Sequence, residues 1–247
     1  TPTTIAGRFL AVFEAGLGFA FLGTVVGYLP TMYNAFAQRE IEISLMDARA
    51  GSPPVAVEFL RRTDPPGEGP LCDEMLAAWE RWAAQLLETH ISYPQLSFYR
   101  SQHSNQSWLA TLVTMLDATS LILARSGSGS ATQAQLTFAM ARHALVDITQ
   151  IFVPHYTPGA PERLAPGDMA TLRTLLGAGD TGDDFETRLG ELRLSYEPYA
   201  QALAAYLLLE LPLWVCSKPR HDNWQGGPWD RQIHSRQEAM HRRDDHF

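Results

Sequence analysis

Cysteine is scarce in this sequence: its 247 residues include only two, Cys72 and Cys216. Two thiols so far apart form neither a zinc-binding motif nor a disulfide framework, and free thiols in a reducing compartment are expected. Hydrophobic residues make up 45% of the chain and charged residues 19%. This balance excludes a disordered or collagenous protein and is sufficient for one or two domains with a hydrophobic core.

Basic residues are in the minority. Lys and Arg together number 19 against 27 Asp and Glu, so the formal net charge is −8. Binding to phosphates requires a basic surface, so we expect no nucleic acid partner. The sequence also lacks a Gly-x-Ser-x-Gly elbow, a phosphate-binding loop and a dinucleotide-binding fingerprint. We therefore expect no enzymatic activity and no cofactor.

One long hydrophobic run contrasts with the rest of the chain. Residues 9–29, FLAVFEAGLGFAFLGTVVGYL, comprise 21 residues with a single charge, Glu14. About 20 apolar residues suffice to cross the hydrocarbon layer of a lipid bilayer, so this run predicts a transmembrane helix. The alternatives are a buried core helix and a signal peptide, but the run has neither a polar face nor an obvious cleavage site. More arginine follows the run than precedes it, which predicts a cytoplasmic C-terminal part.

The hydrophobic run is rich in small residues. Gly23 and Gly27 form a GxxxG pair, and small residues at such spacing allow helices to approach closely in lipid. Glu14 is an intramembrane acid, and such a carboxylate is costly unless it faces protein or water. Because Glu14 and Gly18 are four residues apart, they share one face of a helix. These features predict a helix that packs in an oligomer around something polar.

The first 29 residues, TPTTIAGRFLAVFEAGLGFAFLGTVVGYL, resemble the segment after the selectivity filter of bacterial two-transmembrane potassium channels. In that family a turn with a proline precedes a Gly-Arg pair that opens the pore-lining inner helix. Pro2 and Gly7-Arg8 match these features, Gly18 matches the hinge glycine, and Gly23 matches a second glycine. The remaining sequence, including LMDARAGSPP and YRSQHSNQSWLA, is similar to the helical cytoplasmic domain of bacterial two-pore-domain-type potassium channel proteins.

This resemblance implies that the protein is one subunit of a homotetrameric channel, which conducts potassium ions across the bacterial inner membrane. The implied gating hinge and pore-lining positions are Gly18, Phe19, Leu22, Gly23 and Val26. Glu14 would lie near the pore helix or cavity, the inner helix would bend near Gly18, and the cytosolic domain would regulate or assemble the channel.

The printed sequence contains no outer helix, no pore helix and no TVGYG-like filter. The carbonyl rings that replace the hydration shell of potassium are therefore missing from it. We expect the chain to be the C-terminal part of a channel subunit, beginning just after the filter. The alternative is a membrane-anchored cytosolic helical interaction domain without transport activity.

The predicted fold class is all-α: one transmembrane inner helix followed by a cytosolic bundle of five to six helices. The expected division is a post-filter turn, inner helix and cytoplasmic extension in 1–50, a cytosolic helical domain in 51–216, and a polar, disordered tail in 217–247. Within the bundle, apolar periodicity and loop signals predict helices over 55–62, 71–90, 106–124, 131–152, 167–176 and 183–209. The 106–124 helix approaches a membrane span in length, but its polar residues favour a buried core helix.

A dense polar and aromatic stretch follows the 71–90 helix. Its members, which form a candidate ligand or interface loop, are Tyr93, Tyr99, Arg100, His103, Asn105 and Gln106. Loops carry function more often than cores do. The alternative is an interhelical loop whose amides and hydroxyls satisfy backbone groups.

Four groups near this stretch are of the types that bind metal ions: Glu88, His90, His103 and Asp117. Their spacing matches no known ligand pattern, and we expect hydrogen-bonding roles instead of a metal site. The GDTGDD run at 179–184 lacks the spacing of a calcium loop and predicts a turn. The four histidines after residue 217 are expected in a solvated tail.

Overall fold

The computed structural model describes residues 2–63, 73–103, 105–126, 131–155, 162–176, 184–215 and 229. These residues form helices and no strands, which confirms the all-α fold class. The elements are α1 (Ile5–Ala50), α2 (Ala56–Thr63), α3 (Asp73–Ser92), the 3₁₀-helix η1 (Pro94–Phe98), α4 (Trp108–Ser126), α5 (Thr132–Phe152), α6 (Pro166–Leu176), α7 (Phe185–Leu194) and α8 (Glu197–Leu207).

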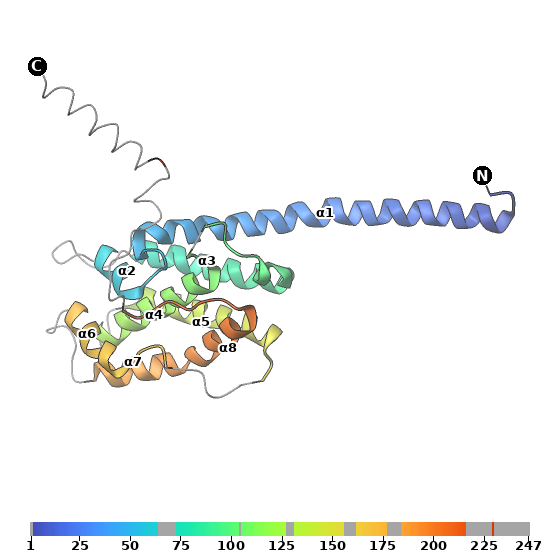
Figure 1. Ribbon diagram of the computed structural model, residues 1–247. Helices are drawn as coiled ribbons and strands as arrows, with labels where there is room; N and C mark the ends of the chain where they lie inside the picture. The colour runs from blue at the N-terminus through green and yellow to red at the C-terminus, as the bar shows by residue number, and fades with distance from the viewer. Residues whose placement is uncertain are drawn as a thin grey trace, which may run out of the picture.

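Helix α1 is 46 residues long and dominates the shape of the molecule (Figure 1). Thr4 caps its N-terminus by accepting a hydrogen bond from the backbone N–H of Gly7 at 3.2 Å. A Cβ on Gly7 would lie 2.9 Å from the Cβ of Pro2, so the turn formed by these two residues requires a glycine. Pro30 lies inside α1 and does not end it, so the predicted extension of the helix through residues 30–50 is confirmed.

The two halves of α1 have different surroundings. The N-terminal half projects away from the other helices, whereas the C-terminal half lies along the bundle (Figure 1). Met32, Phe36, Ile43, Met46 and Ala50 are buried, and the last three belong to the main hydrophobic core. The C-terminal half of α1 is therefore an integral helix of the bundle.

The bundle is built around α4. This helix is apolar enough to cross a membrane, but 83% of its most apolar window is buried inside the protein, so the predicted core helix is confirmed. Helices α3 and α5 pack along each other, and α5 also contacts α4 and α8. Large side chains such as Trp108, Phe59 and Phe185 are fully buried in the core between the helices.

The single helix predicted over 183–209 is wrong, because the chain forms two helices, α7 and α8. Pro198 stands in the first turn of α8, where its missing N–H and fixed φ are tolerated, so the chain begins a new helix here. Tyr196 lies in the turn between the two helices, and its side chain is buried. As a result seven α-helices follow α1 in the described part of the chain, instead of five to six.

Some of the predictions lie outside the described residues. They concern the loop at 64–70, the RSGSGS link from residue 127 onward, most of the GDTGDD run, both cysteines, and the tail with its histidines.

Candidate functional site

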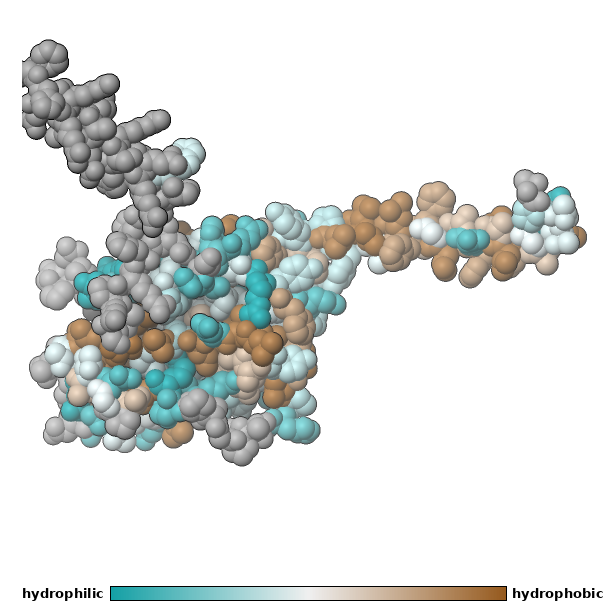
Figure 2. Space-filling view, viewed as in Figure 1, coloured by the Kyte–Doolittle hydropathy of each residue, from teal (hydrophilic) through white to brown (hydrophobic). Residues whose placement is uncertain are grey.

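The residues predicted to line the pore all lie on the projecting half of α1. Gly18, Phe19, Leu22, Gly23 and Val26 are exposed, as is Glu14. The most apolar 18-residue window of α1 has none of its residues buried inside the protein. Figure 2 shows this part of the molecule as an apolar rod. It is long and apolar enough to cross a membrane, and a Cβ at Gly16, Gly18, Gly23 or Gly27 would meet no described atom within 4 Å.

Arg39 ties the other half of α1 to the bundle. Its side chain is only 2% exposed. The Nη1 atom donates to the carbonyl oxygen of Leu96 at 2.8 Å, and Nη2 donates to that of Tyr99 at 2.9 Å. Both Nε and Nη2 also donate to Oε1 of Glu40, at 3.1 and 2.9 Å. A single guanidinium thus holds both ends of the segment that contains η1 against α1. We call this arrangement the α1 junction.

Aromatic contacts extend the α1 junction toward the apolar half of α1. The ring of Tyr28 lies 5.2 Å from that of Tyr93, edge to face, and its hydroxyl donates to Oε1 of Gln95 at 3.1 Å. About two turns of helix further along, the ring of Phe36 lies 6.0 Å from that of Tyr99. The junction therefore begins at the last residues of the apolar run.

His90 completes the α1 junction from α3. Its Nδ1 lies 2.8 Å from the carbonyl oxygen of Leu86, and its Nε2 lies 3.4 Å from Nη1 of Arg39. Because a carbonyl oxygen only accepts, Nδ1 carries the proton and Nε2 faces Arg39 as an acceptor. Burial and the positive charge of Arg39 lower the pKa of His90 to about 3. The imidazole is therefore neutral under ordinary conditions.

The structure brings three of the six predicted loop residues into contacts between elements. Tyr93 and Tyr99 contact α1, and Arg100 donates from Nη2 to the carbonyl oxygen of Leu207 at 2.9 Å, at the end of α8. Ser101 adds a hydrogen bond from its hydroxyl to Oε1 of Glu40 at 3.2 Å. The loop thus clamps α1 to the bundle, mainly through its backbone carbonyls.

The other three predicted loop residues are not part of this clamp. His103 and Asn105 are exposed, and Asn105 has a φ of 61°, a left-handed conformation that asparagine adopts readily. Within the described residues, Oε1 of Gln106 is buried and has no hydrogen-bond partner.

The four groups weighed as metal ligands are not brought together. Glu88 and His103 are exposed, whereas His90 and Asp117 are buried and each has other partners. Among the described residues no cluster of three or more His, Cys, Asp or Glu side chains is arranged to hold a metal ion.

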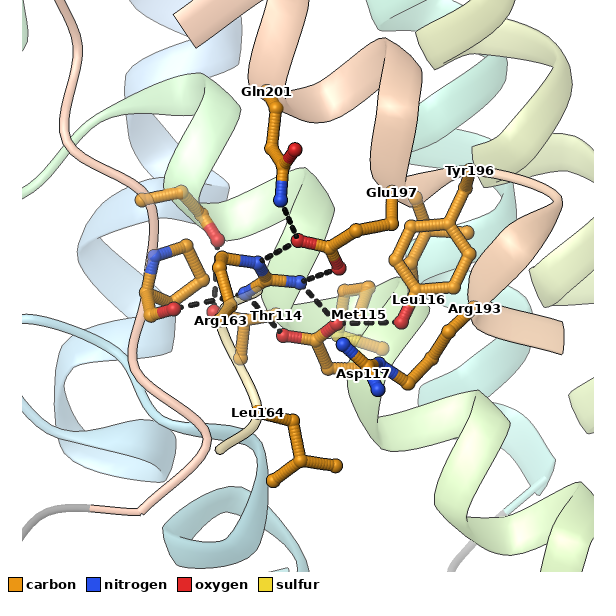
Figure 3. A network of polar contacts seen from close by, with 12 residues as sticks. Thr114, Met115, Leu116, Asp117, Arg163, Leu164, Arg193, Tyr196, Glu197 and Gln201 are labelled. Atoms are coloured by element: carbon orange, nitrogen blue, oxygen red, sulfur yellow. Dashed lines mark hydrogen bonds and ion pairs between the residues drawn. The ribbon is translucent and has the colours of Figure 1, made fainter. Parts of the chain in front are cut away.

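Asp117 belongs to a second buried network, centred on Arg163 (Figure 3). Arg163 donates to both carboxylate oxygens of Asp117, at 3.0 and 2.9 Å, and to both of Glu197, at 2.6 and 2.7 Å. Its Nη1 also donates to the carbonyl oxygen of Pro212 at 2.8 Å. The hydroxyl of Tyr196 donates to Asp117 at 2.6 Å. One guanidinium therefore connects α4, α8 and the segment after α8.

This network contains two carboxylates for one cation. Burial raises the pKa of Asp117, while the charge and hydrogen bonds of Arg163 oppose that rise. Burial and the adjacent Asp117 also raise the pKa of Tyr196 well above its usual value, so its hydroxyl remains a donor. Trp214 covers the network, with its ring 5.6 Å from the guanidinium of Arg163 and 5.1 Å from that of Arg193. The geometry is that of a structural lock, since every strong donor of Arg163 is already used within the protein.

Sequence reasoning missed Arg39 and Arg163, although the pattern around Arg39 contained a signal. Six of the seven buried positions of α1 follow alternating steps of four and three residues, namely Met32, Phe36, Arg39, Ile43, Met46 and Ala50. A charged residue within such an apolar stripe indicates a buried charge with partners on another element. Arg163 has no comparable signal, because its neighbours form no regular helix.

Comparisons of the chain with protein-family models, with curated proteins and with solved structures found no match.

Proposed function

We propose that this chain is the C-terminal part of a bacterial potassium channel subunit, in which residues 9–29 of α1 line the pore and the bundle forms the cytosolic domain. The observation that carries the proposal is the exposed apolar half of a helix whose other half is built into a folded bundle. A long apolar surface without protein cover needs lipid or other helices around it. In the proposed channel four copies of α1 supply this environment.

Two faces of the apolar half support packing around a polar centre. Glu14, Gly18 and Leu22 recur every four residues and so lie along one face. On the roughly opposite face lie the small residues Gly16, Ala20 and Gly27. The first face suits a water-filled pore, which would accommodate the carboxylate of Glu14, and the second suits close contact with another helix.

The α1 junction gives the proposed channel a mechanical connection. Arg39 lies ten residues beyond Leu29, and α1 is continuous between them. A rigid helix transmits displacement along its axis, so movement of the bundles relative to one another would displace the cytoplasmic ends of the pore-lining segments. Gly18 has no side chain, and a Cβ added there would meet no described atom within 4 Å beyond the local helix backbone, so it offers a position where the backbone can bend. Gating by the bundle follows from this connection.

The first test is the reading frame upstream of Thr1. We expect it to encode an outer helix, a pore helix and a TVGYG-like filter. An upstream region without these elements would contradict the channel and favour the membrane-anchored interaction domain.

The second test is electrical. The full-length protein is reconstituted into planar bilayers in potassium chloride, and its open probability is compared with that of Gly18→Ala. We expect the added methyl group to stiffen the helix and shift the open probability. Gly190→Ala on α7 is the matched control, because its new Cβ also meets no described atom within 4 Å and the residue lies outside the proposed pore. Equal gating in the two variants would remove the hinge role of Gly18, and absence of a potassium current would contradict the channel.

A further inference from the structure

Several large apolar side chains remain exposed at one end of the bundle. They are Ile91, Phe98, Ile151, Tyr206 and Leu208, and partly buried Phe152 lies among them. They come from the C-terminal ends of α3, η1, α5 and α8, which lie at the end of the bundle that faces the projecting half of α1 (Figure 1). We call this surface the apolar end face.

Aromatic contacts join three members of the apolar end face. The ring of Phe98 lies 5.4 Å from that of Phe152 and 6.3 Å from that of Tyr206, and the last two are stacked at 5.5 Å. Arg100 joins the same elements through its hydrogen bond to the end of α8. Residues more than fifty positions apart in the chain thus present their rings together to the outside.

Leu208 is the most exposed member of this face. It is 81% exposed and its φ is 54°, a left-handed conformation that a branched side chain seldom adopts. Its backbone N–H donates to the carbonyl oxygen of Ala204 and thereby ends α8. The chain therefore uses a strained cap position to direct a leucine outward, where water offers it no favourable contact.

The α1 junction fixes the position of the apolar end face along the axis of α1, and therefore its depth relative to the proposed membrane span. Tyr28, the second-last residue of that span, contacts Tyr93 and Gln95. Gln95 belongs to η1, the same short helix that carries Phe98. If residues 9–29 cross the hydrocarbon layer, η1 lies where hydrocarbon gives way to lipid headgroups. Tyr and other aromatic side chains are enriched at this depth.

We propose that the apolar end face rests on the cytoplasmic surface of the bilayer and inserts Leu208 and its aromatic neighbours among the lipids. The inference depends on the membrane span of the proposed function. Lipid is favoured over a second protein copy because the same chain already holds this face at the membrane surface. The contact would add a second anchor to the bundle and make its position sensitive to the lipid beneath it.

The test measures the surroundings of single nitroxide labels in the full chain, reconstituted in vesicles of phosphatidylcholine and phosphatidylglycerol. Cys72→Ser and Cys216→Ser remove the native thiols, and labels are attached in turn at Leu208→Cys and Ile151→Cys. The matched control is Leu194→Cys at the end of α7, because Leu194 is 76% exposed, close to the 81% of Leu208. Leu175→Cys on α6, at the opposite end of the bundle, is a second control (Figure 1).

Electron paramagnetic resonance then compares collisions of each label with oxygen, which concentrates in lipid, and with a water-soluble nickel chelate. We expect the oxygen-to-nickel ratio at Leu208 and Ile151 to exceed that at Leu194 and Leu175 several-fold. Equal ratios at all four positions would overturn the inference, and so would labels at Leu208 that are shielded from both reagents, since a second protein copy would then cover the face.

A label at Leu17→Cys separates this inference from the proposed function. If Leu17 is in lipid while Leu208 is in water, the span stands and the apolar end face does not contact the membrane. If Leu17 itself is in water, the span fails and this inference fails with it.

Discussion

The guanidinium Nη1 of Arg39 lies 3.4 Å from Nε2 of His90, although the two residues are 51 positions apart in the chain. Arg39 is the most buried cation on α1, and His90 gives it an acceptor only while the imidazole is neutral. This pair, together with the carbonyl oxygens of Leu96 and Tyr99, fixes the long helix to the bundle.

Loss of the Arg39 side chain should weaken this attachment. Arg39→Met removes donors from two carbonyl oxygens and from Glu40, and such buried groups are costly without partners. We expect the free energy of unfolding to fall by about 3 kcal/mol, measured by denaturant unfolding in detergent with tryptophan fluorescence. Arg49→Met is the control, since among the described residues Arg49 donates to the carbonyl oxygen of Leu45 in its own helix, and its effect should stay within about 0.5 kcal/mol. Equal losses in both variants would contradict the role of Arg39.

His90 should make the protein sensitive to acid. Its native pKa of about 3 lies below the usual 6.5, so between these values the unfolded chain binds a proton that the native protein does not. The free energy of unfolding should therefore fall as pH decreases from 6.5 toward 3, by about 1.4 kcal/mol per pH unit from this residue. His90→Gln retains an acceptor for Arg39 and does not titrate, so its stability should decline less steeply over this range. Parallel pH profiles of the two proteins would count against a buried neutral His90.

Removal of the central cation of the second network should have the opposite pH dependence. Arg163→Met leaves Asp117 and Glu197 buried without their partner, and we expect a loss of about 3–5 kcal/mol at pH 7. Without Arg163, burial of Asp117 is no longer opposed and holds its native pKa above that of the unfolded chain, so acid should restore part of the lost stability. Denaturant unfolding at pH 7 and pH 5 measures this change. Arg188→Met, which disrupts an exposed pair with Asp184, should have little effect at either pH, and a deficit in Arg163→Met that does not shrink at pH 5 would contradict the assignment.

A charge in the apolar half of α1 should impair membrane insertion. Leu17 is exposed near the middle of the proposed span, and an arginine there costs about 3 kcal/mol to insert. We expect Leu17→Arg to be released from membranes by alkaline carbonate to a greater extent than the parent protein. Leu45→Arg places the same substitution at an exposed position of the same helix, within the half that packs on the bundle, and should be retained. Equal retention of both variants would count against the span.

The helices of this protein were largely predictable from the sequence because their signals are local. The helix predicted over 106–124 agrees with α4 to within two residues at each end, and the cytoplasmic extension predicted up to residue 50 agrees with the end of α1. The exception, one helix predicted over 183–209, arose because the apolar pattern continues through Tyr196 while the backbone does not. From the sequence alone, a proline in the first turn of a helix cannot be distinguished from a proline in a helix interior, because the position of the helix start is not known.

The loop at 93–106 was recognised as important, but its partner was not. Its polar and aromatic composition suggested a ligand or another subunit, whereas Tyr93 and Tyr99 contact α1 of the same chain. The bonds that hold it run mainly from Arg39 to backbone carbonyls, and every residue has a carbonyl. The types of side chain along the loop therefore do not predict these hydrogen bonds.

The sequence by itself determined the all-α class, the approximate helix limits and the apolar run long enough to cross a membrane, because each depends on residues that are neighbours in the chain. Only the tertiary structure decided that Arg39 and Arg163 are buried, that the apolar α4 is enclosed by protein while the apolar half of α1 is not, and that Phe98 meets Tyr206. Burial depends on which surfaces meet after folding. A charge or an apolar side chain can be assigned to core, water or lipid only when its distant neighbours are known.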